Sequence, residues 1–148
     1  MARGRALEKS VISVVAKNLN VKVNSCGAII DPRYPVVIGS PDGVGDGFVM
    51  EVKCPTCEKV ISNYLTKEDR PKDKYYAQIQ LQMFLYKCRK GYFCVADPKF
   101  EQNNKVTVIL VKYSEVYVKS LIDKSVSFWK INIFPKLLQS AACCLIDK

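Results

Sequence analysis

The chain has 148 residues, and none of them is histidine. Without histidine, this chain cannot supply a histidine general base, a Ser–His–Asp triad or a histidine-ligated metal site. Any catalysis has to rely on carboxylates, lysine, tyrosine, cysteine or a metal ion held by oxygen atoms. Long apolar runs are also missing: none approaches the roughly 18 residues of a membrane span, so we expect no membrane segment.

Acidic residues are few compared with basic ones. The chain has 23 Lys and Arg against 14 Asp and Glu, a formal net charge of +9. This excess favours a polyanionic partner, because Lys and Arg release condensed counterions when they neutralise phosphates. The hydrophobic share of 49% allows a buried core, and the length fits a single domain over residues 1–148.

The seven cysteines are an odd number with irregular spacing. Because no secretory signal precedes them, we expect reduced thiols in an intracellular compartment, the nucleus or the cytoplasm. The Cys54-Pro-Thr-Cys57 segment could be half of a zinc site or a redox pair, but a second pair at that spacing is missing. An alternative to an enzyme is a small zinc-binding interaction domain, in which Cys88 and Cys94 would join Cys54 and Cys57.

Hydrophobic periodicity predicts a mixed α/β fold, in which helices sandwich a β-sheet. Helices are expected at residues 5–18, in a short segment after 58, at 74–90 with Gly91 as the residue after the C-cap, and from a Ser114 cap until Pro135 bends or ends the last one. Strands are expected at residues 21–23, 28–30, 36–38, 48–53, 92–96 and 106–112.

Strand 48–53 places two opposite charges side by side. Its even-numbered apolar residues face the core, so Glu51 and Lys53 share the opposite face with Val49. Asp46-Gly47 is a strong hairpin-turn signal, which brings Asp42 close to these two side chains.

Asp42, Glu51 and Lys53 together are suited to metal-dependent hydrolysis. Two carboxylates on adjoining strands can hold Mg²⁺ or Mn²⁺ through oxygen. A neighbouring lysine can orient the attacking water or stabilise charge in the transition state. The alternative is an ordinary solvated Glu–Lys pair, which contributes little to stability.

Several motifs in order along the chain resemble one known family. They are Gly4-Arg5-Ala6-Leu7-Glu8, Ser40-Pro41-Asp42-Gly43, Glu51-Val52-Lys53-Cys54-Pro55, Tyr75-Tyr76-Ala77-Gln78-Ile79-Gln80 and Ala96-Asp97-Pro98. Together they resemble the lambda-exonuclease-like family, or YqaJ-type viral recombinases, of the PD-(D/E)xK nuclease superfamily. The resemblance implies a restriction-endonuclease-like fold, a mixed β-sheet core flanked by helices.

The resemblance also implies a role for individual residues. The catalytic residues would be Glu8, Asp42, Glu51, Lys53 and Gln78. The metal ligands would be Asp42, Glu51, the backbone carbonyl of Val52, and Glu8. Ser40 and Tyr75 would contact DNA, whereas Tyr76 is expected in the core.

The implied function is a Mg²⁺- or Mn²⁺-dependent 5′→3′ exonuclease that acts on double-stranded DNA in recombination or repair. The resemblance further implies a ring-shaped homo-oligomer and a single-strand annealing protein as a partner. Similar family members carry further sequence before the first helix, which helps to bind the 5′-phosphate; we expect this extension to be missing here. The alternative is a nucleic-acid-binding module on the same fold that is catalytically inactive or endonucleolytic.

Overall fold

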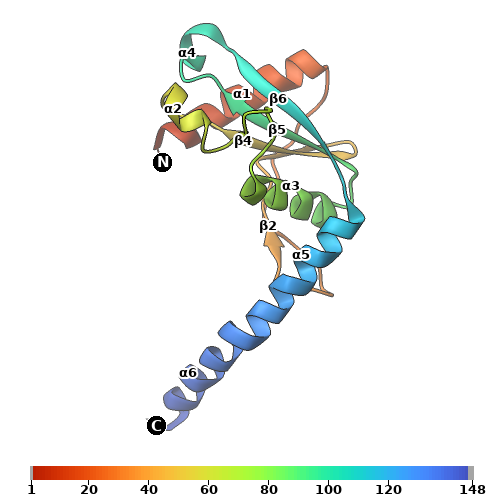
Figure 1. Cartoon of the computed structure of the whole chain (residues 1–148), viewed down its shortest axis with the longest axis vertical. Helices are drawn as coiled ribbons and strands as arrows, with labels where there is room; N and C mark the ends of the chain where they lie inside the picture. The colour runs from red at the N-terminus through yellow and green to blue at the C-terminus, as the bar shows by residue number, and fades with distance from the viewer. Residues whose placement is uncertain (1, 147–148) are drawn as a thin grey trace.

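A four-stranded mixed sheet lies between helices in the computed structural model, which describes residues 2–146 and the side chains of residues 6–141. The helices are α1 (Ala2–Leu19), α2 (Glu58–Ile61), α3 (Asp73–Tyr86), α4 (Phe100–Asn103), α5 (Glu115–Phe128), the π-helical turn η1 (Trp129–Ile133) and α6 (Phe134–Ile146). The strands are β1 (Ile29–Ile30), β2 (Ile38–Gly39), β3 (Gly43–Gly45), β4 (Phe48–Lys53), β5 (Lys90–Ala96) and β6 (Val106–Lys112). Figure 1 shows α1 and α3 on opposite sides of the sheet.

The sheet has the order β3-β4-β5-β6, and β1 pairs with β2 in a separate small sheet. Strands β3 and β4 form an antiparallel hairpin, β4 and β5 are parallel, and β5 and β6 are antiparallel. The parallel pair needs a crossover connection, which α2 and α3 supply. The predicted mixed sheet flanked by helices is confirmed.

The two faces of β4 belong to two different apolar clusters. Phe48, Met50 and Val52 pack with Val11 and other residues of α1. Val49 packs on the other face, in a cluster that includes residues of α3. The predicted alternation along this strand is therefore confirmed, and it places Glu51 and Lys53 on the α3 side.

Helix α3 ends earlier than expected. The predicted helix over residues 74–90 is wrong at its end, because Lys87 takes a left-handed conformation (φ 57°) directly after Tyr86. Gly91 is not a helix cap but the second residue of β5. A Cβ atom there would lie 2.8 Å from side-chain atoms of Ile79, so Gly91 allows α3 to pack closely on the sheet.

The expected strand over residues 21–23 is also wrong. In this region only Asn24 makes an isolated bridge, to Val44 in β3. The strands expected at 28–30 and 36–38 are present only as the two-residue strands β1 and β2. The chain near them is rich in proline, which cannot donate to a ladder.

Helix α5 begins as predicted, since the Ser114 hydroxyl accepts a hydrogen bond from the backbone N–H of Tyr117. The helical structure does not end at Pro135, because α5 continues through η1 into α6. The turn η1 shifts the hydrogen bonding by one residue, with the N–H of Phe134 donating to the carbonyl of Trp129. Proline has no N–H to donate, and a local change of register accommodates it within a helix. Figure 1 shows α5 and α6 running away from the sheet as one long rod.

None of the described helices is long and apolar enough to cross a lipid bilayer.

Candidate active site

Glu51 and Lys53 form the centre of the candidate site. Lys53 Nζ lies 2.5 Å from Glu51 Oε1, and the two side chains are 19% and 3% exposed. Both project from β4 toward α3, as the alternation of the strand predicts. A carboxylate as buried as Glu51 needs hydrogen-bond donors around it, because burial without them is costly.

Asp42 lies directly before β3 and is tied to the same strand. Its Oδ2 accepts a hydrogen bond of 2.7 Å from the backbone N–H of Val52. Burial, the negative charge of Glu51 and, to a smaller extent, that of Glu8 raise the pKa of Asp42 to about 7. The structure therefore brings Asp42 next to Glu51, and it places Glu8 of α1 within electrostatic range.

Helix α3 supplies two amide groups to Glu51. Gln78 Nε2 donates to Glu51 Oε1 and Gln82 Nε2 to Glu51 Oε2, each at 2.7 Å. The predicted proximity of Gln78 to the site is thus observed, whereas Gln82 was not among the predicted site residues. Its spacing on α3 was a usable signal, since Tyr75, Gln78 and Gln82 occupy positions i, i+3 and i+7 of one helix.

The Lys53 ammonium is surrounded by groups that keep it charged. Burial favours its neutral form, but the charge of Glu51 and the hydrogen bond to it outweigh burial and raise the pKa of Lys53. Lys53 Nζ also lies 5.3 Å from the centre of the Tyr75 ring, close enough for a favourable cation–π contact. The Tyr75 ring in turn packs between Tyr64 and Phe93.

The other predicted contact residue, Ser40, is exposed. Its backbone carbonyl lies 3.4 Å from Gln82 Nε2. Tyr76, which was expected in the core, is half-buried and packs against Tyr117. The DNA contacts of Ser40 and Tyr75 remain predictions.

The donor set suits a hard divalent cation held by few protein groups. Within residues 6–141, no three His, Cys, Asp or Glu side chains converge closely enough to hold one metal ion. The adjacent carboxylates are those of Asp42 and Glu51, which repel each other. Mg²⁺ usually binds through one or two carboxylates and completes its shell with water and substrate phosphate. The residues present therefore fit Mg²⁺, and the ligand roles of Glu8 and the Val52 carbonyl remain predictions.

The four cysteines of the zinc alternative do not meet. Cys94 lies in the apolar cluster on the α1 side of the sheet, and Cys88 lies in the cluster on the α3 side. Because the sheet separates these two thiols, they cannot ligate a common ion with Cys54 and Cys57. The zinc-binding interaction domain is wrong.

Thiol reactivity should separate Cys57 from Cys94. Cys57 is exposed, whereas Cys94 is buried and burial raises its pKa to about 12. Only the thiolate reacts with alkylating agents. A brief treatment with iodoacetamide at pH 8, followed by peptide mass spectrometry, should therefore label Cys57 and leave Cys94 unmodified. In urea both should react, and equal labelling in the folded protein would contradict this placement.

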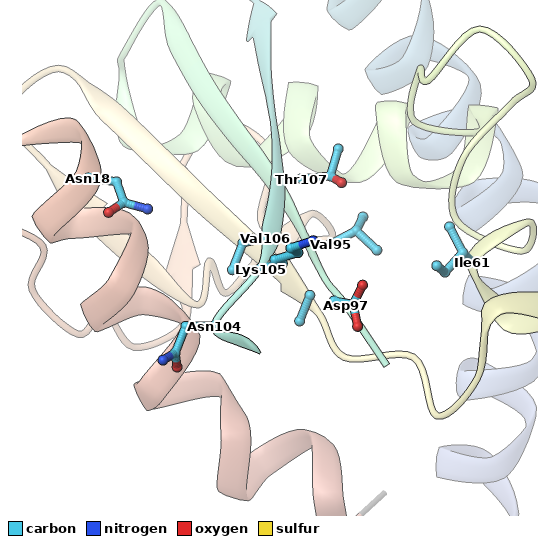
Figure 2. Close-up of a pocket in the computed structure, with 9 residues that line it drawn as sticks. Asn18, Ile61, Val95, Asp97, Asn104, Lys105, Val106 and Thr107 are labelled. Atoms are coloured by element: carbon cyan, nitrogen blue, oxygen red, sulfur yellow. The ribbon is translucent and has the colours of Figure 1, made fainter. Parts of the chain in front are cut away.

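Two hollows lie beside the carboxyl end of β5, whose Val95 pairs with Lys53. One has a volume of about 490 Å³; Figure 2 shows it with Asn18 on one side and Ile61 on the other. The second, of about 620 Å³, shares Asp97 with the first. The Asp97 carboxylate accepts hydrogen bonds from the N–H of Lys99 and from Asn103 Nδ2. Asp97 therefore orders the turn around α4, which gives the Ala96-Asp97-Pro98 motif a structural role.

Comparison with known proteins gives a family and a fold. The family model of the YqaJ-like viral recombinase domain matches residues 1–88. An alkaline exonuclease, LHK-Exo from Laribacter hongkongensis, has a similar structure: the TM-score is 0.81 and the identity 24%, over 98% of this chain and 75% of that one. A phage-related exonuclease from Haemophilus somnus 129PT is similar with a TM-score of 0.65 and 17% identity, over 83% of this chain and 65% of that one.

At these identities the solved structures establish the fold alone, and no curated protein sequence matches the chain. The family model extends over more than half of the chain and includes Glu8, Asp42, Glu51, Lys53, Gln78 and Gln82. The chain belongs to the YqaJ-like viral recombinase domain family.

Proposed function

We propose that this protein is a metal-dependent deoxyribonuclease that hydrolyses phosphodiester bonds of DNA. One observation carries the proposal: a buried carboxylate, Glu51, is held by Lys53, Gln78 and Gln82 beside a second carboxylate, Asp42. A buried carboxylate such as Glu51 is unfavourable beside a second, half-buried carboxylate when no cation is present, and sites of this kind are typical of functional centres. A protein that only holds DNA would gain nothing from negative charges facing phosphates.

The residues of the site divide the chemistry among them. Asp42 and Glu51 would hold Mg²⁺ or Mn²⁺, which when bound acidifies water and polarises a phosphoryl oxygen. The Lys53 ammonium, fixed against Glu51, is placed to stabilise negative charge that develops on the phosphate in the transition state. Its raised pKa keeps it protonated at neutral pH, so we assign it an electrostatic role.

We propose further that the enzyme is a 5′→3′ exonuclease on double-stranded DNA. The fold shared with LHK-Exo, an alkaline exonuclease also solved in complex with dAMP, supports an exonuclease. The net charge of +9 favours DNA as the partner. Polarity, the ring-shaped oligomer, the annealing partner and the role in recombination rest on the family resemblance.

A comparison of linear and circular DNA tests this proposal. A 5′-phosphorylated linear duplex should be degraded in the presence of Mg²⁺, and the same molecule closed into a covalent circle should survive. EDTA should abolish the degradation. Cleavage of the circle would indicate an endonuclease instead. Binding of the linear duplex without degradation in Mg²⁺ or Mn²⁺ would favour the inactive binding module. Labels at either end of the linear strand report the direction of digestion.

A further inference from the structure

Gln82 connects three parts of the candidate site. It lies on α3 and is 2% exposed. Its Nε2 donates to Glu51 Oε2 in β4 and lies 3.4 Å from the Ser40 carbonyl, two residues before Asp42. One amide group therefore contacts both the central carboxylate and the segment that leads to its acidic neighbour.

The two carboxylate oxygens of Glu51 accept different numbers of hydrogen bonds. Each carboxylate oxygen can accept about two hydrogen bonds. Oε1 receives two donors, Lys53 Nζ and Gln78 Nε2, and Oε2 receives one, Gln82 Nε2. Oε1 is therefore saturated, and Oε2 retains one acceptor position.

Gln82 is kept in this orientation at a cost. Its own Oε1 is buried and has no hydrogen-bond partner, which is unfavourable for a carbonyl oxygen. The amide cannot turn to relieve this, because its oxygen would then face the acceptor-only carboxylate of Glu51. An apolar side chain of similar shape would avoid the unpaired oxygen but would leave Glu51 Oε2 without its donor, so the glutamine is explained by its contact with Glu51.

We propose that Gln82 is a positioning residue for the metal site: it orients Glu51 so that one acceptor position on Oε2 stays available for a divalent cation. The inference rests on the proposed function, because it needs the cation. Partners of this kind, which hold a metal ligand without touching the metal, typically contribute 10- to 100-fold to metal affinity or activity.

The same helix offers a matched control. Gln80 is also fully buried, but it donates to the carbonyl of Lys112 and accepts from the N–H of Ser114. Its amide joins α3 to the end of β6 and the start of α5, and both of these hydrogen bonds lie away from the site. Gln80→Met and Gln82→Met therefore remove the same group from the same helix, in one case beside Glu51 and in the other away from it.

Calorimetric titration with Mn²⁺ tests the inference on the full chain. Gln82→Met should bind Mn²⁺ about 10- to 100-fold more weakly than the unmodified protein, whereas Gln80→Met should bind it normally. With saturating Mn²⁺, Gln82→Met should lower kcat for DNA hydrolysis and leave KM for DNA nearly unchanged. Gln82→Asn, whose shorter amide does not reach Glu51, should behave like Gln82→Met and serves if the methionine variant does not fold.

The outcomes separate this inference from the proposed function. Normal Mn²⁺ affinity in the Gln82 variants, or an equal loss in Gln80→Met, would overturn the positioning role and leave the nuclease proposal in place. No Mn²⁺ uptake by the unmodified protein would overturn the proposed metal site, and the positioning role with it.

Discussion

Lys53→Met should lower kcat for duplex DNA hydrolysis by about 10²- to 10³-fold, the usual loss when one donor to transition-state charge is removed. Methionine keeps an unbranched apolar stem of similar size, so the change removes mainly the ammonium that lies against Glu51. DNA binding should change little, because one phosphate contact is a small part of a polyelectrolyte interaction. A quenched-fluorescence assay on a labelled duplex measures kcat and KM together.

Lys59→Met is the matched control for this prediction. Lys59 is an exposed lysine of α2, and its loss removes the same charge from the net total. It should retain kcat, with at most a modest rise in KM. Full activity in Lys53→Met would contradict the assigned role of Lys53, and equal, metal-dependent activity in every preparation would point to a contaminating nuclease.

Phe93→Ala should reduce the free energy of unfolding by about 3–5 kcal/mol, the range for removing a buried aromatic ring from a packed core. Phe93 is 0% exposed and belongs to the cluster between the sheet and α3. Its ring also packs against Tyr75, beside Lys53. The variant should therefore lose both stability and the ordered surroundings of the site. Urea denaturation followed by circular dichroism measures the change.

Leu110→Ala in the neighbouring strand β6 is the control for Phe93→Ala. Leu110 is 51% exposed, and a surface substitution of this kind usually changes stability by no more than about 0.5 kcal/mol. Similar urea midpoints for the two variants would mean that the core does not lie on the α3 side of the sheet as described.

The central part of the site could be predicted because strand β4 follows a simple rule. The period of two in a strand places Glu51 and Lys53 on one face, and the Asp46-Gly47 turn folds β3 back so that Asp42 reaches Val52. Both relations are local in sequence. Strands β4, β5 and β6 and the flanking helices followed from similar local patterns, whereas β3 (Gly43–Gly45) was not among the predicted strands.

Features that depend on distant contacts could not be predicted in the same way. The C-terminal end of α3 is decided by β5, since Lys90 and Gly91 pair with β4 instead of continuing the helix. The spacing of Gln82 with Tyr75 and Gln78 indicated a shared helix face, but its role could not be predicted, because it depends on the buried carboxylate of Glu51 that lies opposite it. Residue type alone does not reveal such a partner.

The parallel pairing of β4 and β5 has a consequence for how the protein folds. Phe48 pairs with Lys90 and Lys53 with Val95, so this pairing must close the whole intervening chain, including α3, into a loop. Contacts between residues far apart in sequence form late and slowly, because chain entropy is lost before the contacts compensate for it. Glu51 acquires its amide donors from α3 at the same step. A nascent chain should therefore remain without nuclease activity until β4 and β5 have paired, which would delay any cleavage of DNA until this part of the protein has folded.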